Sequence, residues 1–551
     1  MNAIMSLFGM LTVMYVGLTY TFLVKGMVCV MEIEIFKLGI LGFNLYLYLD
    51  WVSIIFLLVV SLIMSCTVYY SKSYMLNESN LFLFMLLLSG FVFSMYIMVV
   101  SMNMWMIMMG WDGLGVTSYL LITYYQSSVS NFSSMVTMLS NRMGDVGMIL
   151  GGVVMMGSVG SMDVVSAVFL QESTNLMMVM LIFGGFTKSA QMPFSVWLPM
   201  AMAAPTPVSA LVHSSTLVAA GAYLMVRFGV FLGNSSVVFK WFMLMCLFTL
   251  LMSSVMALVE VDIKSVIALS TMSQLSLMIF VILVGSEVAG LYHLLMHALY
   301  KALLFLCSGV FIHSMWGGQD IRNYGVCYKM NGVVGGVFMV CGASLMGFPY
   351  MSGFYSKDLI LDIVVSMNFN LFVMGVVLLS VMCTVLYFMR LLYWGVMSYS
   401  KGVLISGFGV NDSMVKSLLL CYIFVLCGGA GVNWVVVDMF EGVYMGLVLK
   451  LLSLIIFMLG MGVFIYFTGV SMLRSHYLGS MFYFMEVQSK VVSGVFQSLG
   501  FVSMNAEFML ESGLIKKLGA MVINGHKKVF LMKFMVSFMS IWYMLVAMFV
   551  M

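Results

Sequence analysis

The feature that most constrains this chain is a repeated apolar segment of roughly 20 residues, which recurs along almost the whole sequence. A helix of that length spans the hydrocarbon core of a bilayer and satisfies its own backbone hydrogen bonds. Of 551 residues, 63% are hydrophobic and 8% are charged, which is more apolar surface than a soluble domain can bury. The short alternating segments of a membrane β-barrel are absent. We therefore predict an all-α polytopic membrane protein.

About fifteen transmembrane helices can be placed from hydropathy. They cover residues 5–24, 46–69, 81–100, 103–123, 134–157, 176–198, 208–232, 239–259, 265–284, 288–312, 332–350, 369–396, 416–437, 444–468 and 532–550. These spans form one continuous membrane domain. The longest polar stretch, 471–530, carries scattered charges and is predicted to be a helix lying in the membrane interface, with a partly irregular loop as the alternative.

Two spans are predicted to be broken helices. Residues 183–194 and 347–358 each combine Gly, an aromatic residue, Pro, small polar residues and one lysine, Lys188 or Lys357. Proline removes a backbone donor, and glycine permits an unwound turn. The chain has only five prolines, so the presence of one in each lysine-containing segment supports a helix break there. Paired broken helices in the two halves of a membrane protein indicate inverted repeats with an ion site at the breaks.

A stripe of ionisable residues lies within the apolar segment from Val288 to Phe311. His293, His297 and Lys301 recur every four residues, a spacing that places all three on one face of a helix. Exposure of such a group to lipid costs about 2.5–3.5 kcal/mol, so the stripe must face protein or water. A row of titratable groups is what a proton relay needs. Metal binding by the two histidines is the weaker alternative, because no third ligand is evident.

Asp112 and the pair Arg142 and Asp145 are further charges within spans. Asp112 is predicted to be an acidic partner for a buried lysine. Arg142 and Asp145 lie three residues apart and can form either a structural ion pair or one that tunes Asp112. Lys188 is the strongest candidate for a proton-exchanging group, because a buried ammonium changes its protonation more readily than a guanidinium.

His213 is flanked by hydroxyl residues and can pass protons, although a lone histidine is often a satisfied core residue. Asp262 and Lys264 are placed in a loop between spans, and a solvated loop is the simpler interpretation. Lys357 and Asp358 close the second broken segment, with an interfacial ion pair as the alternative.

Several classes of function are disfavoured by the sequence. No basic tract indicates nucleic-acid binding, and the nine cysteines lie singly without a Cys-x-x-Cys pair. No glycine-rich phosphate loop follows a strand. We therefore expect no bound metal or nucleotide. The 64 methionines pack like flexible leucines, and this composition resembles that of proteins encoded by mitochondrial genomes.

The motifs, in their order and spacing, resemble those of the chain 5 family of NADH–ubiquinone oxidoreductase, the distal antiporter-like subunits of respiratory complex I. The match extends from about residue 44 to 396. It is carried by Trp-Asp-Gly-Leu-Gly at 111–115, Asn-Arg-Met-Gly-Asp at 141–145, Thr-Lys-Ser-Ala-Gln-Met-Pro-Phe at 187–194, Ala-Pro-Thr-Pro-Val-Ser-Ala-Leu-Val-His-Ser-Ser-Thr at 204–216, Asp-Ile-Lys at 262–264, the histidine and lysine stripe, Gln-Asp-Ile-Arg at 319–322 and Gly-Phe-Tyr-Ser-Lys-Asp at 353–358.

The resemblance implies two inverted five-helix repeats, each with a broken helix, followed by a lateral helix and a terminal anchor. The implied divisions are 1–100 for N-terminal helices, 101–235 and 236–400 for the two repeats, 401–470 for additional helices, 471–530 for the lateral helix and 531–551 for the anchor. It also implies a polar axis along the membrane midplane that carries protons. Its members would be Asp112, Lys188, His213, His293, His297, Lys301 and Lys357, supported by Arg142, Asp145, Asp262, Lys264 and Asp358.

The resemblance further implies a subunit of the mitochondrial inner membrane that pumps protons and binds no cofactor itself. NADH, FMN, iron–sulfur clusters and ubiquinone would belong to other subunits, and the partners would include the adjacent chain 4, subunits beneath the lateral helix and lipids such as cardiolipin. The family usually has Glu where this chain has Asp112, and two N-terminal spans where this chain has room for one. The alternatives are an Mrp-type cation/proton antiporter subunit, another antiporter-like subunit of the same complex, and a purely structural membrane subunit.

Overall fold

The computed structural model describes residues 2–38, 41–76, 78–159, 175–229, 237–325, 332–367, 369–397, 412–436 and 446–467. The predicted lateral helix, 471–530, and the terminal anchor, 531–551, lie outside these residues. The chain divides into two units, Met1–Asn368 with Val376–Gly479 and Phe369–Gly375 with Ser480–Met551. All contacts described below lie within the first unit.

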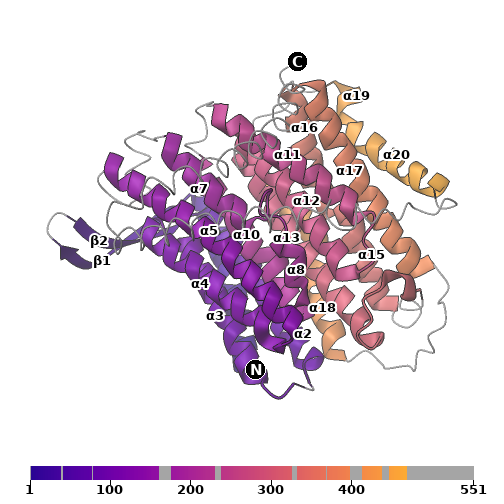
Figure 1. Cartoon of the computed structure of the whole chain (residues 1–551), viewed down its shortest axis with the longest axis horizontal. Helices are drawn as coiled ribbons and strands as arrows, with labels where there is room; N and C mark the ends of the chain where they lie inside the picture. The colour runs from indigo at the N-terminus through magenta and orange to yellow at the C-terminus, as the bar shows by residue number, and fades with distance from the viewer. Residues whose placement is uncertain are drawn as a thin grey trace, which may run out of the picture. The chain divides into compact units, whose positions relative to one another are not determined.

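The described residues are almost entirely helical (Figure 1). The first part of the chain contains α1 (Asn2–Lys25), β1 (Cys29–Leu38), β2 (Leu41–Leu49), α2 (Trp51–Tyr74), α3 (Leu81–Val100), α4 (Met104–Ile122), η1 (Thr123–Tyr125), α5 (Ser128–Val159), α7 (Asn175–Lys188), α8 (Trp197–Met200), η2 (Ala201–Ala203), α9 (Thr206–Val208), η3 (Ser209–Thr216) and α10 (Leu217–Arg227). The second part contains α11 (Val237–Ala257), α12 (Ile263–Val284), α13 (Glu287–Ser314), η5 (Ile321–Asn323), α15 (Gly332–Met346), α16 (Ser352–Ser366), α17 (Leu371–Leu392), η6 (Tyr393–Met397), α18 (Asp412–Val436), α19 (Leu447–Lys450) and α20 (Leu452–Phe467).

Among the described residues, nine helices are long and apolar enough to cross a membrane, and three shorter apolar helices accompany them. The prediction of an all-α polytopic membrane protein is confirmed. The predicted segment 81–100 coincides with α3. Helix α16 was not anticipated as a separate helix, because Lys357, Asp358 and Asp362 lower its hydropathy.

A β-hairpin precedes α2 and was also not anticipated. Strand β1 pairs antiparallel with β2, with Cys29 opposite Leu49 and Glu32 opposite Tyr46. The segment from Cys29 to Glu34 alternates apolar and polar side chains after Val30, a period that suits a strand and not a helix. Because β2 occupies residues up to Leu49, the second span begins at Trp51 and not at the predicted residue 46.

Helix α13 lies at the centre of the first unit. It contacts α2, α10, α12, α15, α16 and α18, and Figure 1 shows it among these helices. Every residue from Ala289 to Ile312 is buried. A helix that is apolar and buried all round belongs in the core of a large bundle. The histidine and lysine stripe is therefore enclosed by protein and does not face lipid.

A buried ion pair ties the end of α10 to the start of α2. Arg227 binds Asp50 with both terminal nitrogens, at 2.7 and 2.8 Å, and Asp50 caps α2 by accepting a hydrogen bond from the backbone of Ser53. Burial opposes ionisation of Asp50, but the hydrogen bonds and charge of Arg227 outweigh this effect and hold the pKa of Asp50 below its usual value. Sequence reasoning did not single out either residue.

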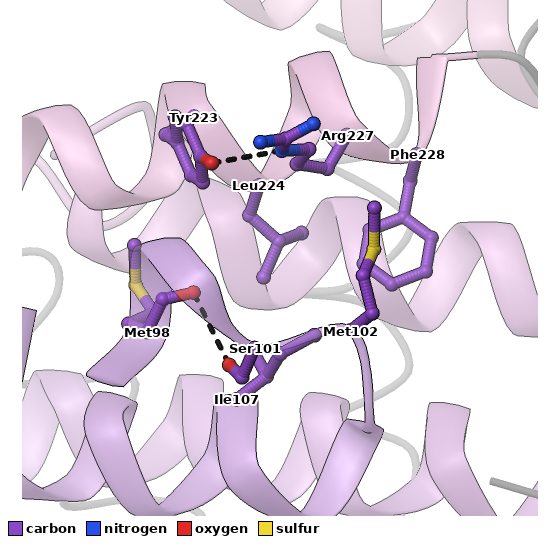
Figure 2. Close-up of a pocket in the computed structure, with 8 residues that line it drawn as sticks. All are labelled: Met98, Ser101, Met102, Ile107, Tyr223, Leu224, Arg227 and Phe228. Carbon is purple, nitrogen blue, oxygen red and sulfur yellow. Dashed lines mark hydrogen bonds between the residues drawn. The ribbon is translucent and has the colours of Figure 1, made fainter. Parts of the chain in front are cut away.

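A pocket in the described part of the chain lies beside this ion pair (Figure 2). Its walls come from the end of α3, the start of α4 and the end of α10. Arg227 donates a hydrogen bond to the hydroxyl of Tyr223 at 2.8 Å, and Met98, Ile107 and Phe228 supply apolar wall. None of the predicted relay residues lines it.

Candidate functional site

The first predicted helix break is present. Helix α7 ends at Lys188, and α8 begins at Trp197. Between them, Ala190 has a left-handed φ of 54°, and the Met192–Pro193 peptide is cis. The predicted span 176–198 is therefore two helical pieces joined by an irregular turn. Lys188 occupies the last residue of α7, where the backbone carbonyls of a helix end favour a positive charge.

Lys188 is completely buried and lies against α4. Its Nζ donates a hydrogen bond to the backbone oxygen of Trp111 at 2.6 Å and lies 3.8 Å from the centre of the Trp111 ring. Among the described residues, no carboxylate oxygen lies within 4.0 Å of this amine. The ammonium is thus held by a carbonyl and an aromatic face instead of by an ion pair.

The nearby acids belong to a cluster on α4 and α5. Arg142 contacts Asp145 at 3.0 Å and Asp112 at 3.6 Å. Asp145 is buried and also accepts a hydrogen bond from Nε1 of Trp111 at 3.0 Å, whereas the side chain of Asp112 is 44% exposed. Asp112 therefore pairs with Arg142 and not directly with Lys188. Asp145 is linked to Lys188 through Trp111.

Glycines bring the helices around Lys188 into close contact. A Cβ atom at Gly144 of α5 would lie 1.9 Å from Oγ1 of Thr187, the residue before Lys188. A Cβ atom at Gly221 of α10 would lie 2.5 Å from the backbone oxygen of Gly185 on α7. Only glycine permits these approaches, and they keep the end of α7 packed between α5 and α10.

His213 lies beyond the break, on the π-helical segment η3. It is fully buried, and neither ring nitrogen has a hydrogen-bond partner among the described residues. Its ring centre lies 6.3 Å from that of Trp197, whose Nε1 donates to the backbone oxygen of Thr187 at 2.9 Å. Trp197 thus lies between the end of α7 and His213.

Asp262 and Lys264 differ in their surroundings. Asp262 precedes α12 and is exposed, as expected for a loop residue. Lys264 lies in the first turn of α12 and is only 6% exposed, and its Nζ donates to the backbone oxygen of Ala204 at 3.0 Å. The solvated-loop interpretation therefore applies to Asp262 and not to Lys264. Lys264 reaches back to the segment that follows the first break.

The stripe on α13 is helical, as predicted, and each member contacts a neighbouring helix or another member. Nδ1 of His293 lies 2.8 Å from Oγ of Ser356, and its Nε2 lies 3.2 Å from Oε1 of Gln274. The rings of His293 and His297 have centres 6.4 Å apart. Lys301 donates to Oγ of Ser270 and to the backbone oxygen of Ile267, the latter at 3.4 Å.

The second predicted break separates α15 from α16. Helix α15 ends at Met346, Gly347 has a φ of 87°, and α16 begins at Ser352. Nζ of Lys357 donates to Oγ1 of Thr384 at 2.9 Å and to the backbone oxygens of Leu345 and Met346 at 3.3 and 3.5 Å. The amine thus lies at the carbonyl end of the broken helix, where a cation is favoured.

Asp358 does not form an ion pair with Lys357 in the described part of the chain. Its carboxylate instead accepts a hydrogen bond from Oγ of Ser453 on α20 at 2.5 Å. The interfacial ion pair that was the alternative interpretation of Lys357 and Asp358 is therefore not formed.

The family model described as "NADH:quinone oxidoreductase/Mrp antiporter, TM" matches residues 101–383, the region that holds both breaks and the α13 stripe. NADH-ubiquinone oxidoreductase chain 5 of Aedes aegypti is 38% identical over 80% of this chain and 77% of its own length. The protein of the same name from Locusta migratoria is 40% identical over 78% of this chain and 75% of its own length. The chain belongs to the chain 5 family of NADH-ubiquinone oxidoreductase.

The fold is shared more widely than this family. A chain in the structure of the Mrp complex from a Dietzia species superposes with a TM-score of 0.77 at 22% identity, over 96% of this chain and 60% of that chain. At this identity the likeness concerns the fold alone. Together with the relatives it indicates a membrane protein that works within a multi-subunit complex.

Sequence reasoning located the lysines and histidines of this chain 5 family member but missed most of their partners. Trp111 was quoted only as part of a motif, and the oxygens that hold the other groups were not anticipated. They belong to Ser270, Gln274, Ser356 and Thr384. These polar side chains stand within apolar helices, and that pattern in the sequence could have identified them as partners. No group of three potential metal ligands occurs among the residues that the structure describes.

Proposed function

We propose that this chain is a core membrane-arm subunit of NADH:ubiquinone oxidoreductase that moves protons across the mitochondrial inner membrane. Electron transfer from NADH to ubiquinone then takes place in other subunits, and this chain carries proton translocation and no redox chemistry. The observation that supports the proposal best is the series of buried titratable side chains at two helix breaks and along α13. Burying so many ionisable groups in a membrane protein is costly and indicates function.

Four buried lysines share one arrangement that suits proton exchange. Lys188, Lys264, Lys301 and Lys357 are each held by carbonyl or hydroxyl oxygens, with no carboxylate within 4.0 Å in the described part of the chain. Because no adjacent carboxylate fixes the charge, each amine can take up or release a proton through a neighbouring group or water. Neutral oxygens accept a hydrogen bond from both the protonated and the neutral amine.

The proposed relay connects these amines through the histidines. His213 lies on η3, which follows the first break and packs against α13. On α13, His297 lies between His293 and Lys301, and His293 contacts Ser356, the residue before Lys357. Asp112, Arg142 and Asp145 form a charged cluster at the Lys188 end of the relay. Proton transfer over gaps longer than a hydrogen bond requires water between the groups. We assign supporting roles to Asp262, which precedes α12, and to Asp358, which lies on α16 and accepts a hydrogen bond from Ser453 of α20.

The assignment of domains and partners belongs to the same proposal. Residues 101–235 and 236–400 would form the two repeats, each containing one break. The neighbouring chain 4, other subunits of the complex and lipids including cardiolipin would cover the outer helices. NADH, FMN, iron–sulfur clusters and ubiquinone would be bound by other subunits.

A native gel of detergent-solubilised mitochondrial membranes tests the assignment to the complex. In-gel NADH oxidation marks the active band, and peptide mass spectrometry identifies its chains. We expect this chain in the large NADH-oxidising band. Its presence only in a small band without NADH activity would reject the proposal and favour the Mrp-type antiporter subunit.

A further inference from the structure

Trp111, on α4, contacts two charged groups of the candidate site, Lys188 and Asp145. It is completely buried. Its ring face and its backbone oxygen hold the ammonium of Lys188, at 3.8 Å from the ring centre and 2.6 Å from the oxygen. Its Nε1 donates to one oxygen of Asp145 at 3.0 Å, and Arg142 binds the other oxygen at 3.0 Å.

The two kinds of contact use different parts of the indole. The ring face is electron-rich and attracts a cation, most strongly when the cation is removed from water. The indole N–H at the ring edge is a donor only, so it requires an acceptor such as the Asp145 carboxylate. The position of the ring over Lys188 is therefore fixed by the hydrogen bond at its edge.

A hollow between α4 and α5 lies on the other side of this contact. Asp112, Arg142 and Asp145 line it, and the side chains of Asp112 and Arg142 are 44% and 47% exposed. Lys188 does not line the hollow and is wholly buried. Trp111 thus contacts both the buried amine and a carboxylate on the wall of the hollow.

We propose that Trp111 is a positioning residue that couples the protonation of Lys188 to the Arg142–Asp145 pair. This inference rests on the proposed function, because it gives Trp111 a role only if Lys188 exchanges protons. A protonated Lys188 is stabilised by the ring, and the ring is held in place by Asp145. By linkage, any change in the Asp145 contact alters how strongly Lys188 holds its proton, and the reverse is also true.

The charged groups that act on Lys188 come from two helices. Asp145 and Arg142 lie on α5, and Asp112 lies on α4. Helix α10, which also packs against α7, approaches it with the backbone of Gly221. The side chain of Trp111 contacts both Lys188 and Asp145.

The test uses the intact complex in sealed vesicles and measures protons pumped per NADH oxidised as a function of pH. Trp111→Phe keeps an aromatic face but removes the N–H donor, and Trp111→Leu removes both. If Lys188 must be protonated once in each cycle, the pH at which pumping is half lost on the alkaline side should fall. We expect a fall of roughly half a unit for Trp111→Phe and about one unit for Trp111→Leu.

Trp197→Phe is the matched control. It removes a buried indole donor at the same broken helix, the bond to Thr187, without contacting the amine of Lys188 or Asp145. We expect it to leave the alkaline midpoint in place. The double variant Trp111→Phe with Asp145→Asn should shift the midpoint by less than the sum of the two single shifts, because both changes break one bond.

A uniform loss of pumping at every pH in Trp111→Phe, with an unchanged midpoint, would show that Trp111 is structural only and would overturn the inference. If Trp111→Leu fails to assemble, the comparison of Trp111→Phe with Trp197→Phe decides. Lys188→Ala, measured in parallel, distinguishes failure of the proposed relay from failure of the proposed role of Trp111. Normal pumping in that variant rejects the relay itself. Lost pumping in Lys188→Ala with unshifted Trp111 variants rejects only the role of Trp111.

Discussion

At the scale of single residues, the chain holds its buried cations in two ways. Arg227 is paired with Asp50 and keeps its charge, whereas Lys188 and Lys357 are held by neutral oxygens. An arginine with a bidentate carboxylate serves as a fixed structural link, and a lysine without one suits proton exchange. The sequence predicted the lysines from their place beside the breaks. It could not predict Thr384 or Asp50 as partners, because these contacts join distant segments.

Removal of the Asp50 carboxylate should destabilise the start of α2. Asp50→Asn leaves Arg227 buried without its countercharge, which costs about 3–5 kcal/mol for a buried pair. Asp320→Asn is the control, since its partner Arg322 is about half exposed and such pairs contribute at most about 1 kcal/mol. Amide hydrogen exchange at the start of α2 and around η5 measures both effects. Equal effects of the two changes would show that burial does not govern the Asp50 pair.

The same ion pair predicts a dependence of stability on pH. The pKa of Asp50 in the folded protein lies below its value in the unfolded chain, which is about 3.9. Its contribution is therefore complete above that pH and is lost as the pH falls through the lower folded value. The protection of α2 amides should decline in this acid range in the wild type. A decline of the same size in Asp50→Asn would assign it to other groups.

At the scale of elements, the two broken helices are built from the same parts. A residue with positive φ follows each of α7 and α15. Lys188 is the last residue of α7, and the amine of Lys357 lies at the carbonyl end of α15. Proline and glycine made both breaks predictable from sequence. The close approach of α5 to α7 at Gly144 was not predictable, because Gly144 has no pattern that distinguishes it from a packing glycine elsewhere.

Gly144→Ala should separate α5 from α7. The new Cβ would lie 1.9 Å from Oγ1 of Thr187, so the helices must move apart at a cost of about 1–3 kcal/mol. Because Asp145 follows Gly144 and Lys188 follows Thr187, pumping should fall along with stability. Gly115→Ala on α4, where a Cβ meets open space, is the control. Normal pumping in Gly144→Ala would show that this contact does not position the site.

At the scale of the whole molecule, hydropathy predicts the class of fold. Helix α13 forms the buried interior of the first unit. The charges of α13 are enclosed because the helix is buried from Ala289 to Ile312. The hairpin β1–β2 was missed because a search for apolar spans passes over a segment with a period of two. The shared face of His293, His297 and Lys301 on α13 was predictable from their four-residue spacing, since that spacing places side chains on one side of a helix.

The most direct test of the proposed proton relay compares Lys188→Ala with Lys240→Ala in the intact complex. Lys240 is an exposed lysine on α11, so its loss should leave pumping unchanged. Protons pumped per NADH oxidised are measured in sealed vesicles, with NADH oxidation recorded in the same sample. We expect Lys188→Ala to retain assembly but to pump fewer protons per NADH. An unchanged ratio of protons to NADH in Lys188→Ala would contradict a role of Lys188 in proton translocation.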